Sequence, residues 1–284
     1  MNRAGKVVAA VLSARDERQI VVVTGCTSGL GLELCRELAR RGHLVMGCGR
    51  RRDRLDALAA ELGAPHSFVV LDTSKEEQVQ RWAESLHEQG VIPDMIFNNA
   101  GTNQPVGVPW EVDFAETSAA IDVNLKGVLA VCRYFIPLMI DDSRCGSWEG
   151  NLFKVRNGAR TKRIINLSSG LGHCTNPNLT AYSATKWGVE GLSKSIAQAL
   201  QAKGLTHFLC VPFAPGMVGT EMNKLPGCRP ASEWAPKAAA FLLTLQPDQS
   251  GSSVCMPGWY SQEYMDTWSI PEGLPLPKVV VAPK

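Results

Sequence analysis

Short apolar runs recur along the first 256 residues of the chain, and segments with helical spacing of apolar residues separate them. Ile20 to Val23 are four consecutive β-branched residues, the pattern of a strand buried on both faces of a parallel sheet. Leu30, Leu34 and Leu38 then repeat every four residues and mark one face of a helix. This alternation predicts an α/β fold with ligands at the carboxyl ends of the strands.

Later apolar runs extend the same pattern. The further predicted strands are Leu44–Cys48, Phe68–Leu71, Met95–Phe97, Ile164–Leu167, Phe208–Val211 and Ser253–Met256. We therefore predict a single Rossmann-type, doubly wound parallel sheet of about seven strands with helices on both faces. The expected domain spans residues 19–256, between an N-terminal extension (1–18) and a C-terminal tail (257–284).

A glycine-rich turn connects the first predicted strand to the first predicted helix. It contains Thr24, Gly25, Gly29 and Gly31 in the spacing T-G-x-x-x-G-x-G. Glycines let the backbone approach phosphate groups closely, and the free amides of a helix N-terminus favour an anion. The turn predicts a dinucleotide pyrophosphate site; the alternative is a tight turn whose glycines serve packing alone.

The residues after the second predicted strand indicate which dinucleotide binds. An acidic residue there would bind the ribose 2′-hydroxyl of NAD, but this chain has Gly49 followed by three arginines. A guanidinium suits a 2′-phosphate, so we predict NADPH as the cofactor, with Arg50 as the first contact. Arg51 either joins it or belongs to a solvated helix start, which is how we interpret Arg52 and Arg54.

Tyr182 and Lys186 form the candidate catalytic pair. They are four residues apart, so on a helix they share one face, and Ser169 precedes the tyrosine by thirteen residues. A free tyrosine has a pKa of about 10, and a lysine one turn away stabilises the phenolate. The pair therefore marks Tyr182 as a candidate proton donor or acceptor.

Several motifs, taken together, resemble the classical branch of the short-chain dehydrogenase/reductase family across residues 18–256. The matching pieces are TGCTSGLG (24–31), LDTS (71–74), NNAG (98–101), Asn124 in DVNLKG, INLSSG (165–170), Tyr182 with Lys186, and PGMVGTEM (215–222). The resemblance implies reduction of a carbonyl with Tyr182 as the acid. It also implies that Lys186 binds the nicotinamide ribose, Ser169 the substrate oxygen, and Asn124 a proton-relay water.

The resemblance further implies cofactor contacts along the cleft. These are Thr24, Gly25, Ser28, Gly29, Leu30, Gly31, Arg50, Arg51, Asp72, Thr73, Asn99, Ala100, Gly101, Tyr182, Lys186, Pro215, Gly216, Val218 and Thr220. Asp72 would contact the adenine and Thr220 the nicotinamide carboxamide. Alternatives remain for two of them: Asp72 as a helix cap and Asn99 as a pin between central strands. We interpret Ser168 as a structural hydroxyl.

A finer resemblance concerns the substrate. The runs AGTNQPVGVPWEV (100–112), YFIPLM (134–139), ATKWGVEGLSKS (184–195) and EWAPKAA (233–239) resemble plant NADPH-dependent pterin aldehyde reductases. A flat pterin would stack on Trp110 or Trp234, unless these residues serve ordinary packing. The alternatives are a reductase of another ketone, aldehyde or 3-oxoacyl thioester, or a non-catalytic NADP-binding sensor or scaffold.

Two segments around the expected site lack a regular pattern. Residues 217–234 lie where the family carries a substrate lid, and we expect Met217, Met222, Leu225 and Trp234 to line it. Residues 141–162 are polar, glycine-bearing and long for a connection. We interpret them as a solvated surface excursion, with a partner-binding loop as the alternative.

The tail is rich in aromatic residues and proline. Its aromatic residues are Trp259, Tyr260, Tyr264 and Trp268. They favour packing over the active-site mouth or a neighbouring subunit; the alternative is a loosely ordered terminus.

Composition limits the partners. The net charge of +2 gives no reason to expect nucleic acid or a membrane, and five scattered histidines without a C-x-x-C motif predict no metal. The nine cysteines lie mostly in apolar runs, so we expect reduced core thiols and a cytoplasmic location, with an organelle as the alternative. Family resemblance implies a homodimer or homotetramer acting on a small-molecule carbonyl.

Overall fold

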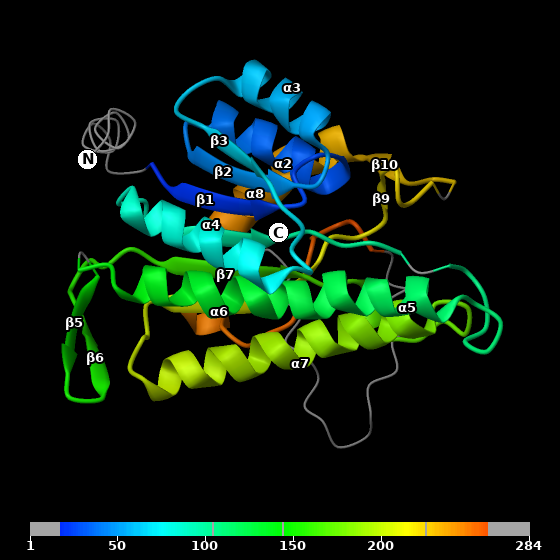
Figure 1. The fold of residues 1–284 in the computed structure, drawn as a ribbon. Coiled ribbons are helices and arrows are strands. Elements are labelled where there is room, and N and C mark those ends of the chain that lie inside the picture. The colour runs from blue at the N-terminus through cyan, green and yellow to red at the C-terminus, as the bar shows by residue number, and fades with distance from the viewer. Residues whose placement is uncertain (1–17, 104, 144, 225, 261–284) are drawn as a thin grey trace.

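A seven-stranded parallel sheet forms the centre of the protein (Figure 1). The computed structural model describes residues 18–103, 105–143, 145–224 and 226–260. The strands are β1 (Ile20–Thr24), β2 (Leu44–Gly49), β3 (Ser67–Val70), β4 (Met95–Asn98), β7 (Lys162–Leu167), β8 (Phe208–Ala214) and β11 (Val254–Cys255). Their spatial order is β11-β8-β7-β4-β1-β2-β3, which confirms the predicted doubly wound sheet.

Helices cover both faces of this sheet. The α-helices are α2 (Gly29–Arg40), α3 (Arg52–Leu62), α4 (Glu76–Glu88), α5 (Phe114–Ile121), α6 (Gly127–Ile140), α7 (Thr180–Ala202) and α8 (Ala231–Thr244). The short helical turns are η1 (Asp122–Lys126), η2 (Gly170–Gly172) and η3 (Pro247–Gln249). Buried residues of α2, α3 and α8 pack on one face, and those of α4, α6 and α7 pack on the other.

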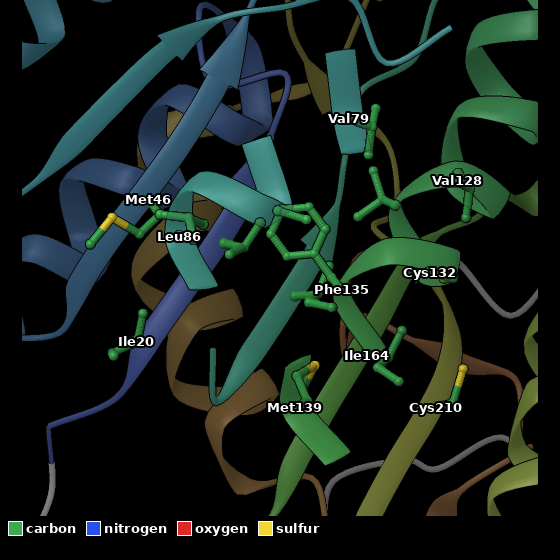
Figure 2. Close-up of a cluster of buried hydrophobic side chains, with 14 of the residues drawn as sticks. Ile20, Met46, Val79, Leu86, Val128, Cys132, Phe135, Met139, Ile164 and Cys210 are labelled. Carbon is green, nitrogen blue, oxygen red and sulfur yellow. The ribbon is translucent and has the colours of Figure 1, made fainter. Parts of the chain in front are cut away.

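Strand β1 is apolar from Ile20 to Val23 because both of its faces are buried. Ile20 and Val22 point into the core layer under α4, α6 and α7, whereas Val21 and Val23 point into the layer under α2, α3 and α8. Figure 2 shows the first layer, with Phe135 among the labelled side chains. A strand between two such layers has no polar face.

Helices α5 and α6 form one continuous helix through the π-helical turn η1. This helix, Phe114–Ile140, is long and apolar enough to cross a membrane by length and composition alone. A single helix of this kind is weak evidence, because core helices of globular proteins pass the same test. Here α6 packs against α4, and α5 packs against α7, as expected of a core helix (Figure 1).

Residues 141–162 contain an antiparallel hairpin of β5 (Gly146–Glu149) and β6 (Leu152–Val155), which the sequence analysis did not predict. The base of the hairpin is fixed by a buried ion cluster. The Lys162 ammonium lies 2.8 Å from the Asp142 carboxylate and 2.9 Å from that of Asp94, and it donates to the Pro93 carbonyl oxygen at 3.0 Å. Residues 141–162 are therefore anchored at the N-terminal end of β7.

Candidate active site

A cavity of about 290 Å³ opens at the carboxyl ends of the central strands. Most of the residues predicted to contact a cofactor line it. They are Gly25, Ser28, Gly29, Leu30, Arg50, Arg51, Asp72, Thr73, Asn99, Ala100, Gly101, Tyr182, Lys186 and Thr220. The structure thus brings the two ends of the predicted site, the glycine turn and the tyrosine–lysine pair, to one cleft.

The glycine turn has a backbone that side chains would obstruct. Gly25 has a φ of +69°, and a Cβ there would lie 2.8 Å from the Cα atom of Ala100. Helix α2 begins directly afterwards, and its N-cap Ser28 makes no side-chain cap, which leaves amides of the first turn available to a ligand. Close backbone approach and free helix amides suit the pyrophosphate of a dinucleotide.

Thr24 and Asn99 hold the glycine turn in place through hydrogen bonds; Asn99 also lines the cavity, whereas Thr24 does not. The Thr24 hydroxyl accepts hydrogen bonds from the backbone amides of Asn99 (3.0 Å) and Ala100 (2.9 Å). The Asn99 side-chain amide donates to the Thr24 and Gly25 carbonyl oxygens at 2.9 and 3.0 Å. A Cβ at Gly31 would lie 2.4 Å from this amide. Asn99 therefore pins β4 to the glycine turn, as the structural alternative proposed.

Arginines and carboxylates meet at the far end of the cavity. The Arg50 guanidinium is 66% exposed and lies 4.0 Å from the Asp72 carboxylate. Arg51 lies 3.2 Å from a carboxylate oxygen of Glu221, and it donates to the Thr27 carbonyl oxygen at 3.2 Å. Guanidinium groups at this place suit a ribose 2′-phosphate.

Asp72 does not cap a helix. Its carboxylate accepts hydrogen bonds from the backbone amide (3.0 Å) and hydroxyl (2.8 Å) of Ser74, whereas α4 begins at Glu76 with Lys75 as its N-cap. The capping alternative was therefore wrong, because the polar turn continues for three more residues before the helix starts. The second carboxylate oxygen of Asp72 faces Arg50.

Tyr182 and Lys186 lie one turn apart on α7. The Lys186 ammonium is 5.4 Å from the centre of the Tyr182 ring, and it donates a hydrogen bond to the Leu167 carbonyl oxygen at 2.7 Å. Burial lowers the pKa of Lys186 to about 8, and the charge of Glu190 opposes this shift. Lys186 therefore keeps its positive charge at neutral pH, where that charge stabilises a phenolate.

Ser169 follows β7 and caps the short turn η2. Its hydroxyl accepts a hydrogen bond from the Leu171 amide at 3.2 Å. Burial raises the pKa of Tyr182, and a hydrogen bond with Ser169 acts in the opposite direction. The net increase keeps Tyr182 protonated at neutral pH, which is the form that a proton donor needs. The neighbouring Ser168 is buried and points away to Glu190, in agreement with a structural role.

Asn124 lies in the π-helical turn η1 and is buried. Its side chain accepts from the Thr102 amide and donates to the Thr102 carbonyl oxygen, both at 2.8 Å. A second contact joins it to the Thr185 hydroxyl at 3.5 Å, next to Lys186. Asn124 thus connects the loop after β4 to α7, the helix that carries Tyr182 and Lys186, and π-helical turns are frequent at functional sites.

In the segment after β8, Thr220 lines the cavity, but Pro215, Gly216 and Val218, which were predicted to contact the cofactor, are not among its lining residues. The Pro215 carbonyl oxygen accepts a hydrogen bond from the Trp234 indole at 3.0 Å. Gly216 has a φ of +88°, and a Cβ there would lie 2.3 Å from Trp259. Val218 is buried in β9 (Val218–Gly219), which pairs with β10 (Arg229–Pro230). Pro215, Gly216 and Val218 therefore shape the backbone that carries Thr220 into the cavity.

The stacking role considered for Trp234 was wrong. The side chain is fully buried, because α8 begins at Ala231 and turns it into the core beside Phe213. Trp110 has the opposite environment and is 80% exposed. Of the other predicted lid residues, Met222 lines the cavity, and Leu225 lies outside the described residues.

The beginning of the tail contacts the turn that follows Ser169. The Tyr260 hydroxyl accepts a hydrogen bond from the Gly170 amide at 3.1 Å, and the Arg229 guanidinium lies 3.6 Å from the centre of the Trp259 ring. The predicted aromatic contacts at residues 264 and 268 lie outside the described residues.

All nine cysteines are described, and none forms a disulfide bond. Eight are buried, and Cys228, in the segment predicted to be the lid, is half-buried.

Some residues of the cavity were not predicted. Beyond the predicted set, its wall contains Thr27, Thr102, Val123, Leu167 and Glu221, together with Cys48, Gly49 and Leu71. Each of them is a sequence neighbour of a predicted residue or motif, so extending each motif by one or two positions would have found them. No local signal predicts that Glu221 pairs with Arg51, because 170 positions separate the two residues.

Comparisons with known proteins agree with this geometry. The chain is 34% identical over 242 residues to the NADPH-dependent pterin aldehyde reductase of Arabidopsis thaliana, with 82% of this chain and 91% of that protein covered. It is 29% identical over 207 residues to a 3-oxoacyl-(acyl-carrier-protein) reductase of Haemophilus influenzae, with 73% and 77% covered.

Solved structures share the fold. A short-chain dehydrogenase from Streptomyces avermitilis has a TM-score of 0.70 and 21% identity, over 89% of this chain and 91% of that one. A variant of actinorhodin polyketide ketoreductase with NADPH has a TM-score of 0.70 and 23% identity, over 85% and 97%. A family model described as short chain dehydrogenase matches residues 19–226. With that match and the Arabidopsis relative, the chain belongs to the short-chain dehydrogenase family.

Proposed function

We propose that this protein reduces a carbonyl group to an alcohol with NADPH. The observation that carries the proposal is the arrangement of three side chains beside the cavity. Tyr182 is hydrogen-bonded to Ser169, and the Lys186 ammonium lies 5.4 Å from the centre of the tyrosine ring. A non-catalytic sensor has no need of a buried proton donor with a charged stabilising partner, so the arrangement favours an enzyme.

The cavity residues suit NADPH, and different residues along the cleft would bind different parts of the cofactor. The amides at the start of α2 would bind the pyrophosphate, and Arg50 with Arg51 would bind the 2′-phosphate. Following the family, Asp72 would contact the adenine and Thr220 the nicotinamide carboxamide. When bound, NADPH supplies the hydride that adds to the carbonyl carbon.

The chain itself supplies the proton and stabilises the charge that develops on the substrate oxygen. Ser169 donates a hydrogen bond to that oxygen, and Tyr182 transfers its phenolic proton to it. Lys186 then stabilises the resulting phenolate electrostatically. Following the family, Asn124 holds a water molecule through which the tyrosine is reprotonated.

A pterin aldehyde is the proposed substrate. The Arabidopsis pterin aldehyde reductase shares more identity, over more of both chains, than the 3-oxoacyl reductase from Haemophilus influenzae does. Val123 and Met222 give the cavity apolar wall area for a flat ring. A 3-oxoacyl thioester, another aldehyde or a ketone is the alternative substrate within the same reaction class.

The test follows NADPH oxidation by absorbance with 6-formylpterin, an acetoacetyl thioester and simple aldehydes. We expect turnover of the pterin aldehyde with NADPH, at least about a hundredfold less with Tyr182→Phe, because a positioned general acid contributes roughly 10²–10⁴-fold. Turnover of other carbonyls alone would retain the reductase and reject the pterin. NADPH binding without any turnover would reject the reductase and favour the sensor.

We further propose that the protein is a homodimer or homotetramer. In the family, the helix that carries the tyrosine and the helix before it pair with a second subunit across a two-fold axis. The corresponding elements are α7 and the continuous helix of α5 and α6, which lie side by side in Figure 1. Leu129 on α6 is half exposed, so this surface keeps an apolar side chain that a second subunit could cover.

A further inference from the structure

Glu190 is a buried carboxylate that the proposed mechanism does not use. It lies on α7, one turn after Lys186, and only 4% of the residue is exposed. A buried charge is unfavourable unless hydrogen bonds and opposite charges offset the loss of water. The partners of Glu190 therefore indicate what the residue is there to hold.

Three side chains approach the carboxylate. Ser168 donates to one oxygen at 2.6 Å, and the His173 Nε2 atom lies 3.2 Å from the same oxygen. Ser253, just before β11, donates to the second oxygen at 2.5 Å. Burial pushes the pKa of Glu190 upward, but His173 and the two serines outweigh it, so that the pKa lies below its usual value. Glu190 is thus a carboxylate at neutral pH.

Two of these partners bracket the catalytic serine. Ser168 and His173 lie at the two ends of the turn that contains Ser169 and η2. The turn sits tightly against α7: a Cβ at Gly172 would lie 2.7 Å from the Ser168 hydroxyl and 3.2 Å from the Glu190 Cγ atom. Because Tyr182 is carried by the same helix as Glu190, these contacts fix the serine relative to the tyrosine.

Glu190 also acts on the charge of the catalytic lysine. Lys186 is faced by the Leu167 carbonyl oxygen from β7, by Tyr182 on its own helix, and by Glu190 one turn away. Burial lowers the pKa of Lys186, and Glu190 opposes that shift. On its other sides Glu190 is faced by His173 and by Cys255, whose thiol pKa is raised by burial and by Glu190.

We propose that Glu190 is a positioning residue for the reduction: its carboxylate clamps the Ser169 turn onto the catalytic helix and keeps Lys186 charged. This role rests on the proposed function for its catalytic consequence, but the clamp and the charge are properties of the folded chain. The titration of Lys186 tests the effect on its charge even without the reaction, and the kinetics of reduction test the catalytic consequence.

The first experiment compares Glu190→Gln with wild type. The amide keeps the size and a hydrogen-bonding oxygen but removes the charge. We expect the alkaline limb of kcat/KM to move to lower pH by about one unit or more, since an opposite charge nearby shifts a pKa by roughly 1–3 units. The Lys186 pKa, followed by NMR of ¹³C-lysine-labelled protein and assigned with Lys186→Arg, should fall by the same amount.

The second experiment tests the clamp without altering the charge. Ser168→Ala should lower kcat by about tenfold through a displaced Ser169, which corresponds to about 1.4 kcal/mol, and should leave the alkaline limb in place. Glu190→Asp keeps a carboxylate, so its pH profile should resemble wild type although its kcat falls. These two variants also cover the case in which Glu190→Gln does not fold.

Glu37→Gln is the matched control. Glu37 is similarly buried (6%) but pairs with Arg40 and Arg41 at the end of α2, so its loss should reduce stability without changing the pH profile. An unchanged Lys186 titration and an unchanged kcat in Glu190→Gln would overturn the proposal. If wild type itself shows no reductase activity, the proposed function fails, while the NMR titration still decides whether Glu190 keeps Lys186 charged.

Discussion

Opposing forces set the protonation of Lys186. Burial favours the neutral amine, while the Glu190 carboxylate favours the ammonium, and the resulting pKa is about 8. The amine also donates to the Leu167 carbonyl oxygen, which fixes its position beside Tyr182. A lysine in this balance is charged at neutral pH and neutral only slightly above it.

The pH dependence of reduction follows from this balance. We expect kcat/KM with NADPH to fall as pH rises through about 8, because Lys186 loses its proton there while Tyr182, whose pKa is raised, keeps its own. The measurement is a pH profile of initial rates with stability checked at each pH. A profile that stays flat to pH 10 would contradict the assignment of the stabilising charge to Lys186.

Arg50 is the residue on which cofactor preference should depend most. Arg50→Ala is expected to raise the KM for NADPH by about tenfold or more and to leave the KM for NADH unchanged, since a charged hydrogen bond contributes roughly 1.5–3 kcal/mol. Steady-state kinetics with both cofactors measure the ratio. Arg52→Ala, two positions along the same exposed cluster, is the control and should change neither value.

At the scale of elements, Gly25 in the glycine turn is subject to two constraints: its positive φ, and the close approach of the Ala100 backbone. Gly25→Ala should destabilise the protein by about 1–3 kcal/mol and weaken NADPH binding, because the φ of +69° strains alanine and its Cβ meets Ala100. Gly42→Ala is the control: its φ is +86°, but nothing lies within 4 Å of the added Cβ. Chemical unfolding and fluorescence titration measure both. Equal NADPH affinity in the two variants would contradict the predicted close approach.

The hairpin of β5 and β6 depends on the ion cluster at its base. Asp142→Ala removes one partner of the fully buried Lys162, so we expect a loss of about 3–5 kcal/mol in the free energy of unfolding. Glu149→Ala breaks an ion pair with Lys154 in the same hairpin, but both side chains there are more than half exposed. That control should cost about 0–1 kcal/mol in urea unfolding. Similar losses in both variants would contradict the role of burial.

The sequence predicted best those elements whose residue pattern is set by burial alone. The inner strands β1, β2, β4 and β8 are the clearest apolar runs, because each is buried along its whole length, whereas the edge strand β3 is partly exposed. The hairpin lacks such a pattern: Gly146–Glu149 carries glycine, serine and glutamate, and its strands pair mainly with each other. The sequence left two roles open for Trp234, stacking and ordinary packing, because its burial depends on where α8 begins rather than on local composition.

At the scale of the molecule, the cavity and the buried ion cluster of Lys162 lie at opposite ends of the parallel strands. The cavity lies where β1, β2 and β4 end, whereas Lys162, the first residue of β7, is anchored at the other end. Most residues that line the cavity could be predicted from sequence, because the motifs that contain them follow strand ends. Contacts such as Arg51 with Glu221 join distant segments and could not.

The assembly is the property to measure at this scale. We expect light scattering coupled to size-exclusion chromatography to give two or four times the chain mass of 30.7 kDa. The reason is the pairing of α7 and the continuous helix of α5 and α6 that the family implies. A single species at the chain mass, at concentrations used for the assay, would contradict it.

The distribution of thiols has a practical consequence. Eight of the nine cysteines are buried, and Cys228 alone is partly accessible, next to β10 in the segment predicted to be the lid. A maleimide dye added to the native protein would therefore attach preferentially at this one position. Without any engineered cysteine, a change in the emission of such a label on addition of nucleotide or aldehyde would test whether the predicted lid moves.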